Sequence, residues 1–209
     1  HYFLNGNFSL ISSLKKVGYK PEDITDVIHT HLHFDHCGGT IKFDENKNLV
    51  PAFQNAKLWV GKNHWDLAIN PNKREKASFL KNNILPMKES GKLKLIENEG
   101  EIIPGISVDI FNGHTRGQII PTININGKYI TYCGDLIPSA AHIPMPYIAG
   151  YDMWAEETLR DKERFFKSSI EKNAVLFFEH DIFTECASLK LTEKGVLADK
   201  TFKLSEYEF

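Results

Sequence analysis

Cysteine is scarce in this sequence, and its spacing suits neither a disulfide framework nor a structural zinc site. Cys37, Cys133 and Cys186 are the only three among 209 residues, and no two of them form a CxxC pair. An odd count without that spacing argues against both kinds of crosslink. We therefore expect three buried or partly buried free thiols, as in proteins of a reducing compartment such as the cytoplasm.

Long apolar runs and a surplus of basic residues are also missing. The longest apolar stretches, such as Ala174 to Phe178, are far too short to cross a bilayer. Lys and Arg number 25 against 27 Asp and Glu, which gives a net charge of −2 and leaves little basic surplus to neutralise phosphates. We therefore expect neither a membrane-spanning protein nor a nucleic-acid partner.

The sequence shows no internal repeat, no low-complexity tract and no initiating methionine. It begins at His1, and HYFLNGNF resembles neither a signal peptide nor a helix cap. We expect the natural gene product to extend upstream of His1, so any targeting signal lies outside this sequence. A chain of 209 residues can bury one large core, and we expect a single domain over residues 1–209.

Hydrophobic periodicity predicts interspersed helices and strands. Apolar residues between Ser9 and Val17 follow helical spacing, and Asp26 to Thr30 is typical of a buried strand. Asn126-Gly127 is a strong signal for a type I′ hairpin turn. Further helices are expected at 62–69, 74–83 and 153–172, and further strands at 57–60, 93–96, 106–111, 119–125, 129–133 and 174–178. The pattern indicates an α/β or α+β protein with two packed sheets and outer helices.

The segment His31-Leu32-His33-Phe34-Asp35-His36 carries the clearest chemical signal. Residues two apart in extended backbone point to the same side, so His31 and His33 can bind one metal ion. Asp35 and His36 follow where the chain turns, and they can reach a second point nearby. Zinc accepts both imidazole nitrogen and carboxylate oxygen. The alternative is a polar loop with solvated histidines.

HLHFDH resembles the signature of the metallo-β-lactamase superfamily, which includes glyoxalase II, ribonuclease Z and quorum-quenching lactonases. Three later segments match the family pattern in the expected order: Gly113-His114-Thr115, Gly134-Asp135 and Glu179-His180-Asp181. Each of these segments alone could be a turn or a surface residue beyond a strand, but their joint order favours metal ligands. The resemblance extends from Ile24 to Asp181.

This resemblance implies a role for each matching residue. Two divalent metal ions would be bound as follows: the first by His31, His33 and His114, the second by Asp35, His36 and His180, and both by Asp135. Zinc is the expected metal, with manganese or iron as alternatives. A hydroxide between the two ions would be the nucleophile, because a bound metal lowers the pKa of water to about 7.

The resemblance also implies an α/β fold, the four-layer αββα sandwich of this family. Only 30 residues precede His31, where family members have several N-terminal strands. We therefore expect part of the first sheet to be missing from this chain. Arg116 replaces the proline of the usual Gly-His-Thr-Pro-Gly segment, which changes the rigidity of the loop but not the ligand.

The remaining histidines have different expected roles. His29 lies on the strand that leads to the motif and is expected in the core or behind a ligand. His64 is expected to be solvated. His142 lies seven residues after Asp135, in a loop expected to border the site. We therefore place His142 with Asp35 and Asp135 among the candidate catalytic residues, although a structural role for His142 is the alternative.

Departures from individual branches of the family narrow the reaction. Lactamases with a cysteine ligand at the second site would need Cys in place of Asp135, although another lactamase subclass keeps the HxHxDH set. Persulfide dioxygenases lack a full second site, and ribonuclease Z would need a basic exosite. Flavodiiron proteins have Glu at the position of His33. Hydrolysis by a complete dinuclear site is therefore favoured.

The proline-rich stretch from Gly134 to Tyr147, followed by Asp152 and a charged helix with Arg160 and Arg164, resembles the lactonase and methyl-parathion-hydrolase-like branch. A generic rigid connection is the alternative for the loop. Lactonases often place a tyrosine three residues after the bridging aspartate, where this chain has Pro138; His142 or Tyr147 could replace it.

If the loop from Leu136 to Tyr147 walls the site, its apolar residues, Ile137 and Ile143 among them, would form an apolar pocket that suits an acyl chain or an aryl group. We therefore expect a small-molecule ester or lactone substrate, with organophosphate cleavage as a side activity. A glyoxalase II-like thioester hydrolase and a non-hydrolytic diiron-type domain are the alternatives. Monomer and homodimer both remain open.

Overall fold

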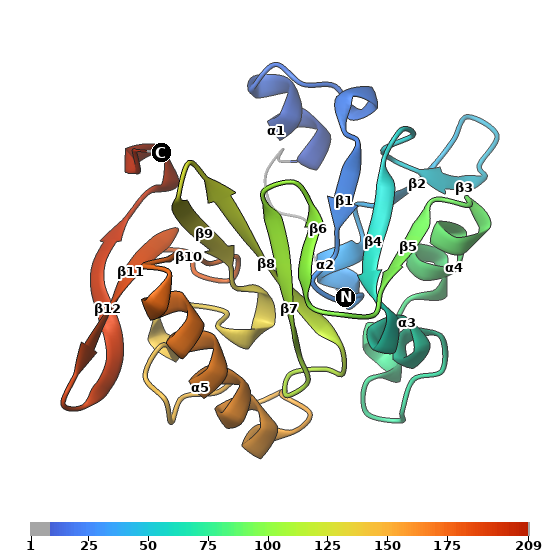
Figure 1. The fold of residues 1–209 in the computed structure, drawn as a ribbon. Coiled ribbons are helices and arrows are strands. Elements are labelled where there is room, and N and C mark those ends of the chain that lie inside the picture. Colours follow the sequence, from blue (N-terminus) through green and yellow to red (C-terminus); the bar gives the residue numbers. More distant parts are fainter. Residues whose placement is uncertain (1–8, 209) are drawn as a thin grey trace. The chain divides into compact units, whose positions relative to one another are not determined.

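The computed structural model describes residues 9–208 of the chain. They form two compact units, one made of the chain up to Val60 together with Trp65–Ile96, the other of Gly61–His64 and the chain from Glu97 onward. Each unit has its own sheet (Figure 1). The mixed α/β class predicted from the sequence is confirmed, whereas the single domain over 1–209 stays a prediction. What precedes His1 lies outside the described residues.

The first unit is built on a three-stranded sheet in the order β1-β4-β5, in which β1 pairs with β4 in parallel. A separate antiparallel pair, β2-β3, lies in the same unit. Leu32, Leu58, Trp65 and Met87 lie in its main core. Its elements are α1 (Leu10–Lys16), η1 (Pro21–Asp23), β1 (Asp26–Ile28), α2 (Phe34–Cys37), β2 (Ile41–Phe43), β3 (Leu49–Pro51), β4 (Lys57–Gly61), α3 (Lys62–Ile69), η2 (Lys76–Ser78), α4 (Lys81–Glu89) and β5 (Leu93–Ile96). The last residue of β4 and the first three of α3, Gly61–His64, belong to the second unit.

The second unit is built on a seven-stranded sheet in the order β12-β11-β10-β9-β8-β7-β6. β9 and β10 pair in parallel, and the other neighbours are antiparallel. The strands β7, β9 and β10 therefore run in one direction and end at the same edge. The elements are β6 (Gly100–Ile103), β7 (Ile106–Phe111), β8 (Gln118–Ile125), β9 (Lys128–Tyr132), η3 (Gly134–Leu136), η4 (Ala140–His142), α5 (Ala155–Glu171), β10 (Val175–Phe177), β11 (Cys186–Thr192), β12 (Gly195–Phe202) and η5 (Leu204–Glu206).

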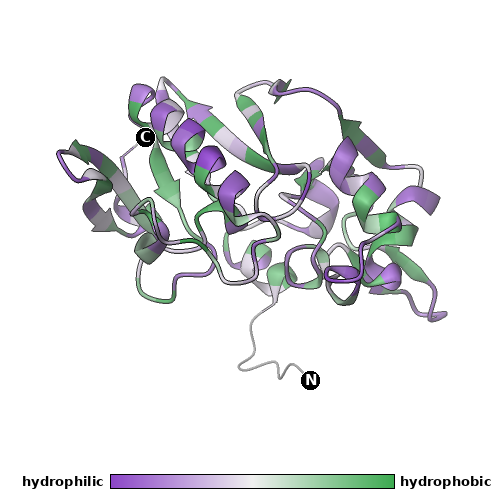
Figure 2. Ribbon diagram, turned by 90° about the horizontal axis from the view of Figure 1, so that it is seen from below, coloured by the Kyte–Doolittle hydropathy of each residue, from purple (hydrophilic) through white to green (hydrophobic). Residues whose placement is uncertain are grey.

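Helix α5 closes the core of the second unit. Its residues Phe165 and Phe166 are buried in one cluster with Phe111, Ile120 and Leu176 of the sheet. Figure 2 shows hydrophilic and hydrophobic bands alternating along α5, as expected for a helix with one buried face. The burial of this face fixes where the first turns of α5 stand against the loops of the unit.

The predicted hairpin at Asn126-Gly127 is confirmed. Both residues have positive φ, 53° and 85°, and they join the antiparallel strands β8 and β9. The predicted helix at 74–83 is wrong, because the side chain of Asn72 accepts hydrogen bonds from the backbone N–H of Arg74 and Glu75. This local turn competes with a helix there, and α4 begins only at Lys81.

Two further expectations can be compared with the structure. Cys37, Cys133 and Cys186 are buried free thiols, as expected. None of the helices within residues 9–208 has both the length and the apolar composition that a bilayer span requires.

The C-terminal strands β11 and β12 were not predicted, since lysines and other polar residues interrupt their apolar alternation.

Gly113 provides a test of how closely α5 approaches the sheet. A Cβ atom at this position would lie 2.3 Å from the backbone nitrogen of Thr158 in α5. We expect Gly113→Ala to lower the free energy of unfolding by about 1–3 kcal/mol, since overpacking forces the backbone to shift. Urea denaturation measures the loss.

Gly150→Ala is the matched control, because a Cβ atom there meets nothing within 4 Å. Its urea midpoint should stay close to that of the original protein. Equal midpoints for the two variants would mean that α5 does not press against Gly113.

Candidate metal centre

Three histidines of the first unit gather where β1 ends. His31 lies in the segment after β1, His33 is the N-cap of the short helix α2, and His36 lies within α2. The ring of His31 is centred 4.5 Å from that of His33 and 3.9 Å from that of His36. The extended backbone at His33, with φ −62° and ψ 150°, lets the chain turn directly into the helix. The rings of His31 and His33 thus lie close together with His36 nearby, and their binding of metal ions stays a prediction.

Neighbouring side chains restrict how these rings can rotate. The hydroxyl of Thr30 lies 3.1 Å from Nδ1 of His31, within hydrogen-bond distance. The buried carboxylate of Glu75 lies 3.6 Å from Nε2 of His33. Partners of this kind orient metal-binding histidines and raise their basicity. Sequence analysis assigned neither Thr30 nor Glu75 a role.

Asp35 lies at the margin of this group. Its carboxylate is 3.5 Å from Nε2 of His36, and 45% of its side chain is exposed. The assignment of Asp35 to the second metal ion stays a prediction.

In the second unit, candidate ligands follow three strands that end at the same edge of the sheet. His114 follows β7, Asp135 lies in η3 directly after β9, and His180 follows β10. Since β7, β9 and β10 run in one direction, the topology brings these three residues together.

The carboxylate of Asp135 lies between two imidazoles. Its Oδ2 is 3.2 Å from Nε2 of His114, and its Oδ1 is 3.2 Å from Nε2 of His180. Asp135 and His114 are buried, whereas 39% of the His180 side chain is exposed. Each carboxylate oxygen therefore faces a different histidine, as expected for a carboxylate shared by two metal ions.

A second aspartate, Asp152, contacts the other ring nitrogen of His114, Nδ1. Oδ1 of Asp152 lies 2.9 Å from Nδ1 of His114, and both side chains are buried. The carboxylate accepts a hydrogen bond from Nδ1–H and so orients the ring with Nε2 toward Asp135. Asp152 was named only as part of the stretch that resembles the lactonase branch, and no role beside His114 was predicted for it. No spacing signal could have identified it, because 38 residues separate it from His114.

Glu179 is another acidic residue that sequence analysis did not assign to the site. The hydroxyl of Tyr132 donates a hydrogen bond to its carboxylate. One carboxylate oxygen of Glu179 lies 3.9 Å from Nε2 of His180, and ligand atoms of Asp135, Glu179 and His180 lie within 4.8 Å of one another. Its position directly before His180 was the only available signal.

Of the predictions for the other histidines, the one for His29 is confirmed and the one for His64 is wrong. His29 is buried and bonded to Thr40, and burial lowers its pKa to about 4, which confirms a core position. His64 was expected to be solvated, which is wrong: it is fully buried and Nδ1 lies 2.8 Å from the carbonyl oxygen of Arg116. His142 is half-buried, its Nδ1 is 2.8 Å from the Ser139 hydroxyl, and burial lowers its pKa.

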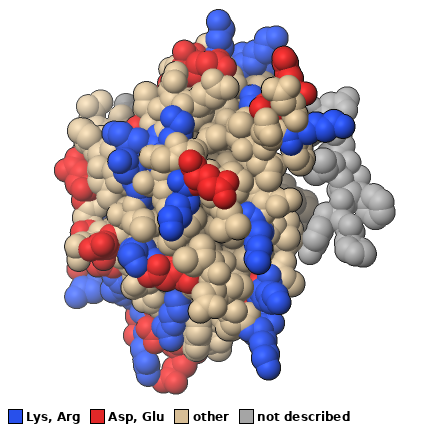
Figure 3. Space-filling model, turned by 90° about the vertical axis from the view of Figure 1, so that its right-hand side faces the viewer, with Lys and Arg blue, Asp and Glu red and all other residues tan. Residues whose placement is uncertain are grey.

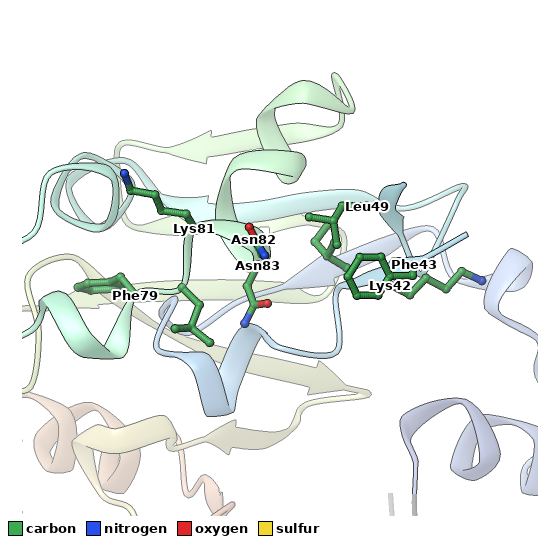
Figure 4. Close-up of a pocket in the computed structure, with 9 residues that line it drawn as sticks. Lys42, Phe43, Leu49, Phe79, Lys81, Asn82 and Asn83 are labelled. Atoms are coloured by element: carbon green, nitrogen blue, oxygen red, sulfur yellow. The ribbon is translucent and has the colours of Figure 1, made fainter. Parts of the chain in front are cut away.

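The first unit also contains a cavity of about 500 Å³, lined by β2, β3 and the start of α4. Figure 4 shows Phe79 on one side of this cavity and Phe43 and Leu49 on the other. The ring of Phe79 also lies 5.0 Å from the ring of His33.

On the face that Figure 3 shows, Lys and Arg are interspersed with Asp and Glu.

Comparisons with known proteins agree with this geometry. An N-acyl homoserine lactonase from Bacillus cereus is 29% identical over 179 residues, which are 84% of this chain and 63% of that protein. The chain thus spans less than two thirds of the length of the curated relatives it matches.

Solved structures of metal-dependent hydrolases are also similar to this chain. The crystal structure of a probable metal-dependent hydrolase from Staphylococcus aureus is similar, with a TM-score of 0.82, 29% identity, and coverage of 94% of this chain and 68% of that chain. AidC, a dizinc quorum-quenching lactonase in complex with a product, is similar with a TM-score of 0.73 and 26% identity, covering 93% of this chain and 70% of that chain.

The family model described as the metallo-beta-lactamase superfamily matches residues 3–174, most of the chain. The resemblance inferred from HLHFDH and its later partners is confirmed, including its similarity to lactonases. The chain belongs to the metallo-beta-lactamase superfamily.

Proposed function

We propose that this chain is a dinuclear metal-dependent hydrolase that opens lactones or cleaves related esters. The observation that carries the proposal is the Asp135 carboxylate, with one oxygen 3.2 Å from His114 and the other 3.2 Å from His180. Buried carboxylates paired on both oxygens with imidazoles are well suited to two cations, since each cation would offset the desolvation of its ligands.

The proposed ligands are those that the family resemblance implies. His31, His33 and His114 hold one metal ion, Asp35, His36 and His180 hold the other, and Asp135 is shared. The grouping of imidazoles within the first unit and of Asp135 with its two histidines within the second supports this assignment. The set of imidazole and carboxylate donors without thiolate suits zinc, with manganese or iron as alternatives.

Metal ions bound by these residues would supply two kinds of chemistry, the activation of a water molecule and the polarisation of the substrate's carbonyl group. The chain's own residues prepare that arrangement. Asp152 orients the ring of His114, and Thr30 restricts His31. Asp135 presents one carboxylate oxygen to His114 and the other to His180. We further propose that His142, whose pKa is lowered by burial, acts as a neutral hydrogen-bonding partner of the substrate.

The apolar residues in the loop after Asp135 have a different role from the one predicted. Sequence analysis expected Ile137 and Ile143 to wall an apolar substrate pocket, but both are fully buried in the core with Phe165 and Phe166. Their hydrophobicity therefore reflects packing against α5. Tyr147, by contrast, is 60% exposed and is available for contact with a substrate.

Support for a lactone substrate now comes mainly from the relatives. The similar proteins include N-acyl homoserine lactonases, and AidC is named as a lactonase. We therefore propose an N-acyl homoserine lactone as the first substrate to test, with aryl esters and organophosphate triesters as weaker ones.

The first prediction concerns metal content. Protein loaded with excess zinc and then desalted should retain about two equivalents per chain, because the ligand set divides into two sites around Asp135. Elemental analysis measures the content, and one equivalent would contradict the dinuclear site. Zinc protein should be colourless; an absorbing diiron chromophore in protein as purified would favour the non-hydrolytic alternative.

The second prediction concerns Asp135. Asp135→Ala should lower kcat/KM on a lactone by several orders of magnitude and reduce the zinc content, since both metal ions lose a ligand. Asp199→Ala is the control, because Asp199 is an exposed residue paired with Lys190. Asp181→Ala is a poor control, since its carboxylate accepts three backbone hydrogen bonds. Equal losses in the Asp135 and Asp199 variants would show that Asp135 is not a ligand.

The third prediction concerns the substrate. The zinc-loaded protein should have a higher kcat/KM for N-hexanoyl homoserine lactone than for an aryl ester, a phosphotriester or a glutathione thioester. Steady-state kinetics on the four compounds makes the comparison. A clear preference for the thioester would instead place the protein with glyoxalase II.

A further inference from the structure

Lys162 is a charged residue inside the second unit that the proposed chemistry does not use. It lies on the buried face of α5, and its side chain has no exposed surface. A lysine is almost never fully buried unless its ammonium group is satisfied. Its surroundings therefore indicate a specific role.

The ammonium group of Lys162 donates to the backbone of one loop. The acceptors are four carbonyl oxygens at 2.7–3.1 Å, those of His142, Pro144, Met145 and Tyr147. Three N–H donors therefore serve four acceptors within a stretch of six residues. A neutral side chain cannot replace this arrangement, because an amide carries only two such donors. The loop depends on Lys162 for its shape.

That loop continues directly into the residue that orients His114. Five residues after Tyr147, Asp152 places its carboxylate 2.9 Å from Nδ1 of His114. The following residue is fixed as well, since Met153 N–H donates to the carbonyl of His114. A displacement of residues 142–147 would therefore reach Asp152 through only four intervening residues.

Electrostatics link the same groups. Burial lowers the pKa of Lys162 to about 8, and the carboxylate of Asp152 acts in the opposite direction by favouring the ammonium form. His142 also responds to this charge, since Lys162 and burial both lower its pKa. At pH 7 the Lys162 side chain is therefore predominantly charged and keeps its three donors.

We propose that Lys162 is a positioning residue that fastens the loop 142–147 and thereby holds Asp152 against His114. It touches neither substrate nor metal ion; it acts on the His114 side of the site through the loop and Asp152. The proposal rests on the proposed function only in its final step, where His114 binds a metal ion.

The test compares three variants of the full chain. Lys162→Gln removes the charge and one donor, Lys162→Arg keeps the charge, and Lys167→Gln is the matched control on the exposed side of α5. Zinc affinity is measured by competition with a chromophoric chelator. We expect Lys162→Gln to weaken one zinc site by about tenfold or more, the size of effect seen when partners of metal ligands are lost. Lys162→Arg should recover most of this loss, and Lys167→Gln should bind zinc normally.

A double-mutant cycle with Asp152→Asn tests the route. If Lys162 acts through Asp152, the combined variant should bind zinc about as weakly as Asp152→Asn alone, since the two changes break the same link. Fully additive losses would overturn the proposal. A lower Tm for Lys162→Gln with unchanged zinc affinity would also overturn it, because that result describes a purely structural lysine.

Hydrogen exchange of the metal-free protein separates this inference from the proposed function. Lys162→Gln should exchange faster than the Lys167→Gln control at the amides of residues 142–153, and Lys162→Arg should not. If the original protein binds no zinc, the proposed function fails while this comparison still decides whether Lys162 fastens the loop. Unchanged exchange in Lys162→Gln would overturn the proposal even in a protein that binds two zinc ions.

Discussion

The shared carboxylate of Asp135 is the interaction on which the second unit depends. It brings His114 and His180 to its two oxygens at equal distances, and this requires the loops after β7, β9 and β10 to end at one place. The strand directions make that possible, because β9 and β10 are parallel and β7 runs with them. Burying the Asp135 carboxylate and the His114 imidazole at one sheet edge is costly without cations, so the fold and the proposed metal site support each other.

Helix α5 organises the loops that surround this carboxylate. The backbone of Thr158 fits closely against Gly113, the Asp161 carboxylate accepts hydrogen bonds from the N–H groups of Asn112 and Gly113, and Lys162 holds the loop at 142–147. These three residues are separated by helical spacing and face the same side. One helix therefore fixes the loop before His114 with a carboxylate and the loop after Asp135 with an ammonium group. Burial raises the pKa of Asp161, and its two backbone hydrogen bonds favour the charged form.

In the first unit, one short segment of the chain brings the candidate histidine ligands together. His31, His33 and His36 come from one short segment, so a strand end and a single helical turn suffice to gather their rings. Long-range contacts enter only through the orienting groups, such as Glu75 beside His33. This difference explains why the HLHFDH segment could be recognised at once, whereas the groups that support the second unit could not.

The sequence by itself determined the family, the mixed α/β class, the hairpin at Asn126-Gly127 and the candidate ligands, because each depends on spacing within a short segment or on the order of a few segments. Only the tertiary structure decided which carboxylates contact the ring nitrogens of the candidate histidine ligands. Asp152 and Glu75 reach their histidines across 38 and 42 residues of chain, and no local pattern encodes such a contact. The same reason explains the errors at His64 and in the loop after Asp135. A polar histidine and an apolar isoleucine have the same sequence whether they face solvent, a substrate or the core, and only packing against distant elements decides among the three.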